Sequence, residues 1–123
     1  MMNPVIQVAI GGAMGAVARY GVNALGRRWT GFPVSTLAVN VIGSFLMGVL
    51  VVVLAHKGGT RHAPLLMTGI LGGFTTFSAF SLDAVALWER GQHGLAAGYV
   101  AASVGLSLAA LVAGLWLARG YVA

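Results

Sequence analysis

Four long apolar segments make up most of this 123-residue chain. They run from about Pro4 to Leu25, Val34 to Ala55, Ala63 to Trp88 and Leu95 to Leu117. Each is long enough for a helix to cross the hydrocarbon core, which takes about 20 residues. The links between them are short and polar or glycine-bearing: GRRWTGF, HKGGTRH and ERGQHG. We therefore predict an all-α membrane protein, with one domain of four transmembrane helices over residues 1–123.

Composition supports the membrane class and argues against several functions. Apolar residues make up 59% of the chain and charged residues 7%, far below the charged share of a soluble domain. The net charge of +5 is carried by scattered single residues, which is not the basic stripe of a nucleic-acid-binding protein. There is no cysteine, so disulfides and thiolate metal sites are excluded. No nucleophile–base pair or phosphate loop is evident, and we do not expect an enzyme.

Lysine and arginine at the segment ends indicate how the chain is oriented. One side of the membrane would carry Lys57, Arg61 and Arg119, and the other Arg27, Arg28 and Arg90. This count of three against three leaves two interpretations open. Either a weak bias is settled by other details, or the chain inserts both ways and the two orientations pair as an antiparallel dimer. Four helices form a thin bundle, so we expect an oligomer in either case.

Small residues recur at every fourth position in three of the segments. This spacing lets membrane helices approach closely. The residues are Gly11 and Gly15, Ser44 and Gly48, and the longer ridge Ala97, Ala101, Gly105 and Ala109.

Polar side chains also recur at every fourth position, and this spacing keeps them on one helix face. They are Thr36, Asn40 and Ser44 in the second segment, and Tyr99, Ser103 and Ser107 in the fourth. One interpretation is that they join helices by hydrogen bonds. The other is a pore wall, whose hydrogen-bond donors without a carboxylate favour an anion over a cation.

The charged residues within the segments do not indicate a proton-coupled pump. Asp83 and Glu89 lie in the distal part of the third segment. Small four-helix multidrug exporters need a glutamate in the first helix, and this first segment has none. Arg19 lies about two-thirds of the way along the first segment, where it either extends to the membrane surface or draws anions into a vestibule.

The stretch GGFTTFSAFS, residues 72–81, combines poor helix formers with polar groups at mid-span. Gly72 and Gly73 each weaken a helix by roughly 1 kcal/mol, and Thr75 and Thr76 add β-branched residues, so we expect the third helix to be broken within this stretch, with the glycines making the break. A break frees backbone carbonyls, which are tolerated only where water, an ion or other groups satisfy them. Phe77 and Phe80 share one helix face, and the positive edges of their rings suit an anion.

This stretch resembles the signature of the Fluc (CrcB) fluoride channels. The similarity extends to the four segments, to Arg19, to the asparagine in TLAVNVIGSFLMG and to the Tyr/Ser track of the fourth segment. It implies passive export of fluoride across the cell membrane. It also implies an antiparallel, dual-topology homodimer with two pores and a structural sodium ion at its centre.

The resemblance also implies a role for individual residues. Phe77 and Phe80 correspond to the two pore phenylalanines and Asn40 to the pore asparagine. Ser103 and Ser107 correspond to the hydroxyl track, with Tyr99 one turn before them. Gly72 and Thr75 correspond to the residues whose backbone carbonyls hold sodium. Ala79 stands where the family commonly has Ser or Thr. The alternative function is a small helical membrane scaffold or assembly subunit with no transport activity.

Overall fold

The computed structural model describes residues 3–26, 32–56, 58, 60–122 of the chain. Three of the basic residues used above to judge orientation, Arg27, Arg28 and Lys57, lie outside the described residues. All regular secondary structure in the described ranges is helical, which confirms the predicted fold class.

The described helices follow the four apolar segments closely. The first two are α1, Pro4–Gly26, and α2, Val34–His56. The third segment contains a 3₁₀ turn η1, Thr60–His62, a π-helix η2, Pro64–Leu71, and two α-helices, α3, Gly72–Phe74, and α4, Phe77–Glu89. The last helix is α5, His93–Val122, which runs beyond both ends of the predicted 95–117. By length and hydropathy, four helical stretches of the described chain are able to cross a membrane.

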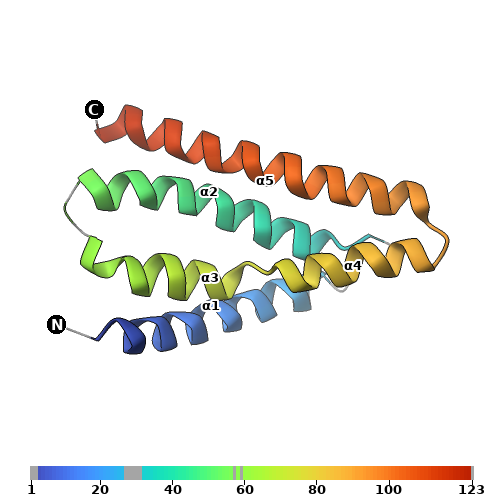
Figure 1. The fold of residues 1–123 in the computed structure, drawn as a ribbon, viewed down its shortest axis with the longest axis horizontal. Coiled ribbons are helices and arrows are strands. Elements are labelled where there is room, and N and C mark those ends of the chain that lie inside the picture. Colours follow the sequence, from blue (N-terminus) through green and yellow to red (C-terminus); the bar gives the residue numbers. More distant parts are fainter. Residues whose placement is uncertain (1–2, 27–31, 57, 59, 123) are drawn as a thin grey trace.

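The helices pack as neighbouring pairs (Figure 1). Helix α1 lies along η2 and α3, while α2 lies along α5, and α4 contacts the first half of α5. The described parts near the N- and C-termini lie at the same end of the molecule, as expected for an even number of crossings (Figure 1).

Glycines allow the backbones to approach closely in two helix pairs, α1 with η2 and α2 with α5. A Cβ atom added to Gly15 would lie 2.0 Å from the carbonyl oxygen of Ile70 in η2. One added to Gly48 would lie 2.3 Å from the oxygen of Leu111 in α5, and Gly114 meets Phe45 of α2 in the same way. Backbones this close have no room for a side chain, so these glycines act as the small-residue contacts expected of membrane helices.

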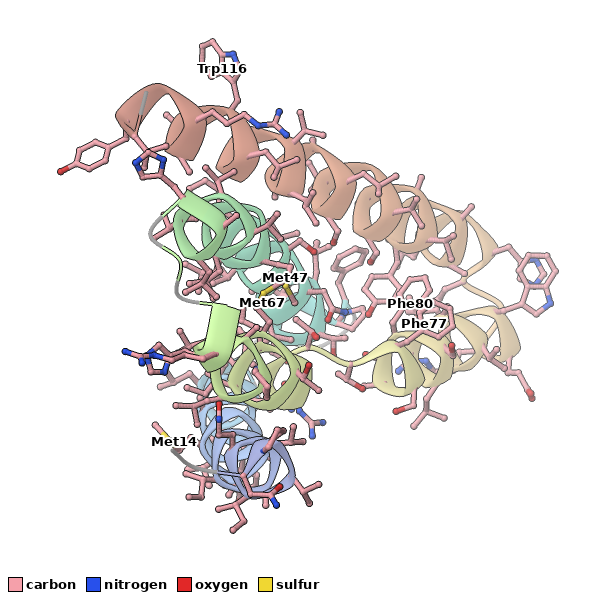
Figure 2. All side chains as sticks on the ribbon, turned by 60° about the vertical axis from the view of Figure 1, so that its left-hand side comes forward. Met14, Met47, Met67, Phe77, Phe80 and Trp116 are labelled. Atoms are coloured by element: carbon pink, nitrogen blue, oxygen red, sulfur yellow. The ribbon has the colours of Figure 1, made fainter. Side chains whose placement is uncertain are left out.

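The exterior of the single chain is largely apolar. Val17, Trp116 and Tyr121 are all well exposed, and Figure 2 shows Trp116 pointing away from the bundle. Such a surface suits a hydrocarbon environment or a partner helix. The predicted ridge of α5 belongs to this exterior: its members Ala97, Ala101, Gly105 and Ala109 are exposed and do not pack inside the chain.

The extended residues of the third segment are its two threonines. Gly72, with φ −62° and ψ −38°, is helical, whereas Thr75 (φ −86°, ψ 158°) and Thr76 (φ −154°, ψ 122°) are extended. The extended residues therefore lie within the stretch expected to break, but the glycines that were expected to make the break stay helical. Thr76 instead starts α4, because its hydroxyl oxygen accepts a hydrogen bond from the Ala79 N–H at 3.1 Å, as an N-cap does. We refer to Thr75 and Thr76 as the linker.

Candidate functional site

A groove of about 400 Å³ runs between α2, the linker, α4 and α5. Five of the predicted pore residues line it: Asn40, Phe77, Phe80, Ser103 and Ser107. The remaining lining residues are Gly43, Ser44, Met47, Thr75, Thr76, Val104, Leu108 and Leu111. We call this feature the polar groove. No acidic side chain is among its lining residues in the part of the chain that the structure describes.

Asn40 connects α2 to the linker through both ends of its side-chain amide. The Thr76 N–H donates to Asn40 Oδ1 at 2.9 Å, and Asn40 Nδ2 donates to the Thr76 carbonyl at 3.2 Å. In a continuous helix the Thr76 N–H would bond to the Gly72 carbonyl. Asn40 therefore gives the Thr76 N–H the partner that the extended linker lacks and adds a donor to the Thr76 carbonyl. One N–H of its amide is left over for the groove.

Ser103 presents a buried hydroxyl with unused hydrogen-bonding capacity. Its residue is 6% exposed, and its Oγ makes no hydrogen bond in the described chain, although the Tyr99 side chain lies beside it. Buried polar atoms without a partner are uncommon and costly, and they often mark sites that bind water or ligand. Ser107, one turn further along α5, lines the same groove and is half-buried.

Three aromatic rings form a row beside the groove. The centroids of Phe77 and Phe80 are 5.4 Å apart, and those of Phe80 and Tyr99 are also 5.4 Å apart. Figure 2 shows Phe77 and Phe80 next to one another between α4 and α5. Phe77 remains 78% exposed in the single chain. A ring this exposed at the edge of a groove has a free face for an ion, for lipid or for a second subunit.

Tyr99 is placed differently from the other residues of its predicted track. It is fully buried, packs with Leu87 and Ala96, and is absent from the groove lining. Its hydroxyl donates to Asp83 Oδ2 at 3.4 Å. The four-residue spacing in α5 correctly brings Ser103 and Ser107 together. It does not bring Tyr99 to the same surface, because the larger side chain turns into the contact between α4 and α5.

The backbone carbonyls around the linker have lost their usual helical partners. The Thr76 N–H, which would serve Gly72, is engaged by Asn40. The Ala79 N–H, which would serve Thr75, is engaged by the Thr76 hydroxyl. The carbonyls of Gly72 and Thr75 are thus the oxygen ligands that a hard cation prefers. The donor set fits the sodium ion implied by the resemblance.

Arg19, in α1, contacts the backbone just before the linker. Its Nε donates to the Gly73 carbonyl at 3.1 Å. This contact differs from the expected extension toward the membrane surface. Arg19 is not among the residues lining the polar groove.

Thr76 and Asp83 belong to the site, although the sequence patterns did not indicate them as site residues. Thr76 had a detectable signal, because a threonine before a new helical run is a common N-cap. Asp83 was noted only by position, and nothing in the sequence paired it with Tyr99. Their partners come from other helices, so spacing along one helix gives no indication of them.

Comparisons with known proteins show which proteins this chain is similar to. The family model described as "CrcB-like protein, Camphor Resistance (CrcB)" matches residues 6–115. A relative from Cereibacter sphaeroides, named "Fluoride-specific ion channel FluC", is 67% identical over 125 aligned residues that cover 100% of both chains. Relatives of the same name from Paracoccus denitrificans and Agrobacterium fabrum are 58% and 53% identical, and the alignments cover 100% and 91% of this chain and 100% and 93% of theirs.

Proposed function

Because the chain belongs to the CrcB family, we propose that it is a fluoride channel that lowers cytoplasmic fluoride by passive export across the cell membrane. Its relatives are named as ion channels, and it is not an enzyme. The alternative is a membrane scaffold, in which the polar residues only join helices.

The observation that carries the proposal is the polar groove with its unpartnered donor. A small, strongly hydrated anion enters a membrane protein only where hydrogen-bond donors replace its water. Asn40, Ser103 and Ser107 supply such donors along one groove without a lining carboxylate. Phe77 and Phe80 add ring edges of positive potential. These rings attract an anion without binding it as tightly as a fixed cation does.

A single chain leaves the groove open on one side, and we propose that a second copy closes it. Phe77 is 78% exposed at the groove edge, and the small-residue ridge of α5 is exposed as well. The even distribution of lysine and arginine supports an antiparallel pair. A two-fold pair of this kind has two equivalent pores, each using phenylalanines of both subunits.

We further propose that a structural sodium ion lies at the dimer centre. The carbonyls of Gly72 and Thr75 from both subunits would hold it, and its charge would offset the mutual repulsion of their dipoles. Replacing sodium by a bulky organic cation should then weaken the dimer, as measured by subunit exchange in detergent. An unchanged exchange rate removes the ion from the proposal.

Fluoride efflux from liposomes tests the function directly. Vesicles containing the purified protein and loaded with potassium fluoride should release fluoride when valinomycin allows potassium to follow, and a fluoride electrode records it. The controls are protein-free vesicles loaded with potassium fluoride and protein-containing vesicles loaded with potassium chloride. If the protein is a scaffold, fluoride release should be no faster than from protein-free vesicles, and that result would reject the channel.

A further inference from the structure

Arg19 makes a hydrogen bond that replaces one lost from the backbone. In a continuous helix the Gly73 carbonyl would accept from the Phe77 N–H. The extended linker ends that arrangement, since Phe77 begins α4. Instead, the Arg19 Nε–H donates to the Gly73 carbonyl oxygen, with Nε 3.1 Å from that oxygen. We infer that Arg19 is a positioning residue: it fixes the linker through its Nε–H donor, and its positive charge is not what conduction requires. The inference rests on the proposed channel function.

Two helices hold the linker and the residues just before it. Asn40 of α2 binds both backbone groups of Thr76, and Arg19 of α1 binds Gly73, three residues earlier. The polar groove lies on the Asn40 side and does not include Arg19 in its lining. A side chain that does not line the groove can still affect the groove by fixing the backbone to which it is hydrogen-bonded. Here Arg19 holds the backbone that carries Thr75, Thr76 and Phe77 into the groove.

The packing of α1 fixes the distance from which Arg19 acts. A Cβ on Gly15, one turn before Arg19, would lie 2.8 Å from the Phe74 backbone nitrogen. A Cβ on Gly73 would lie 2.7 Å from the Gly12 carbonyl. Such close approach brings Nε to the carbonyl. The Arg19 side chain is only half-buried, so the outer part of the guanidinium can stay hydrated, which lowers the cost of a charge at this depth.

Side-chain chemistry allows the donor and the charge to be separated. Glutamine places its amide nitrogen at the same number of bonds from Cα as arginine Nε, but it carries no charge. Lysine keeps the charge but puts a methylene at that position, with its ammonium donor one bond further out. Methionine offers a methyl group there, with neither donor nor charge. If Arg19 acts as a donor, glutamine is the better replacement; if it acts by charge, lysine is.

The first experiment compares fluoride efflux for Arg19→Gln, Arg19→Lys and Arg19→Met. We expect Arg19→Gln to stay within about threefold of the wild type, and Arg19→Met to lose at least about tenfold, as the loss of a hydrogen bond to a charged donor allows. Arg19→Lys should lie clearly below Arg19→Gln. The control is Arg119→Gln, which removes an equal charge from an exposed position on α5. Wild-type efflux from Arg19→Lys with little from Arg19→Gln overturns the inference, as do equal rates in all variants.

A second measurement uses the unaltered protein and does not depend on conduction. In ¹⁵N-arginine-labelled channel, the Arg19 Nε–H should exchange with solvent deuterons at least about tenfold more slowly than the Nε–H of the exposed Arg119, because it is hydrogen-bonded. Its signal is assigned by its absence in Arg19→Lys. Exchange as fast as that of Arg119 overturns the inference even where every Arg19 variant fails to fold. A wild-type protein that shows protection but no fluoride efflux rejects the channel and leaves the positioning bond intact.

Discussion

Asn40 and Ser103 both line the polar groove, but their hydrogen bonding differs. Asn40 is committed to the linker through its oxygen and one amide hydrogen, whereas the Ser103 hydroxyl has no hydrogen-bond partner in the described chain. One side chain therefore maintains the shape of the groove, and the other offers a donor within it. Substitutions at the two positions should have opposite effects on stability.

Asn40→Asp should damage both the linker and conduction at neutral pH. The new carboxylate oxygen would face the Thr76 carbonyl, where an amide N–H now donates. The second oxygen keeps the Thr76 N–H donor, but the Thr76 carbonyl loses its donor and meets a negative charge. We expect a stability loss of about 1–3 kcal/mol at this half-buried position, and at least tenfold slower efflux. Thermal unfolding in detergent and the liposome assay measure the two effects. Asn3→Asp is the matched control, because Asn3 caps α1 through its Oδ1 and aspartate caps equally well. Equal behaviour of the two variants would contradict the assignment.

Ser103→Ala should separate stability from activity. Removing a buried hydroxyl without a partner relieves a desolvation cost, so stability should stay constant or rise by about 1 kcal/mol. Efflux should fall, because the groove loses a donor. Ser81→Ala serves as the control: its hydroxyl donates to the Phe77 carbonyl of its own helix and does not line the groove. A Ser103→Ala protein that is as active as Ser81→Ala would show that this hydroxyl does not meet the anion.

Isoleucine at Phe77 or Phe80 should lower efflux with different structural costs. Phe80 contacts the rings of both Phe77 and Tyr99, so Phe80→Ile should lose about 1 kcal/mol of stability from ring pairing. Phe77→Ile loses one ring contact at an exposed position, and it should change subunit stability less. Both remove the ring edge offered to the anion. Phe45→Ile in α2, outside the groove lining, is the control. Normal efflux from both variants would make the rings packing elements only.

At the scale of the helices, the contact between α1 and α3 bears on the linker, because α3 directly precedes it. Gly15 permits the close approach, and Arg19 uses it to reach Gly73. The interaction between these helices is therefore both a packing contact and the route by which α1 influences the groove.

Gly15→Ala should disrupt this contact, and Gly12→Ala should not. A Cβ on Gly15 would lie 2.0 Å from the Ile70 carbonyl, whereas a Cβ on Gly12 meets nothing within 4 Å. We expect Gly15→Ala to lose about 1–3 kcal/mol of stability by overpacking, and to slow efflux as Arg19→Met does. Gly12→Ala should be neutral or slightly stabilising, because alanine is the better helix former. Unfolding and efflux are measured for both. Equal stabilities for the two variants would rule out the close contact.

For the whole molecule, the apolar exterior and the open groove leave the single chain incomplete. The exposed Phe77 and the exposed α5 ridge are surfaces that a second subunit would cover. An antiparallel pair requires that newly made chains insert in both orientations.

We expect the C-terminus of this protein to face both sides of the membrane in comparable amounts. The reason is the balanced lysine and arginine count, which gives neither orientation an advantage. A cysteine appended after residue 123 and labelled with an impermeant maleimide in intact and opened cells measures the two fractions. Adding lysines to one link should move all copies to one orientation and abolish efflux. A single orientation in the unaltered protein, with full activity, contradicts the antiparallel dimer.

Local patterns determined the elements, and the tertiary structure determined the contacts. Segment length and hydropathy predicted the four membrane-length helices, because crossing a bilayer imposes a fixed number of apolar residues. Four-residue spacing placed Ser103 and Ser107 on one face, and the signature run indicated the family. The sequence marked residues 72–76 for the break but could not show which of them are extended, because the partners beside them, Gly12 of α1 at Gly73 and Asn40 of α2 at Thr76, come from other helices. It also could not show that Asn40, Arg19 and the Thr76 hydroxyl replace the lost backbone bonds. These partners are far apart in sequence or depend on the linker's conformation, so only the folded chain brings them together.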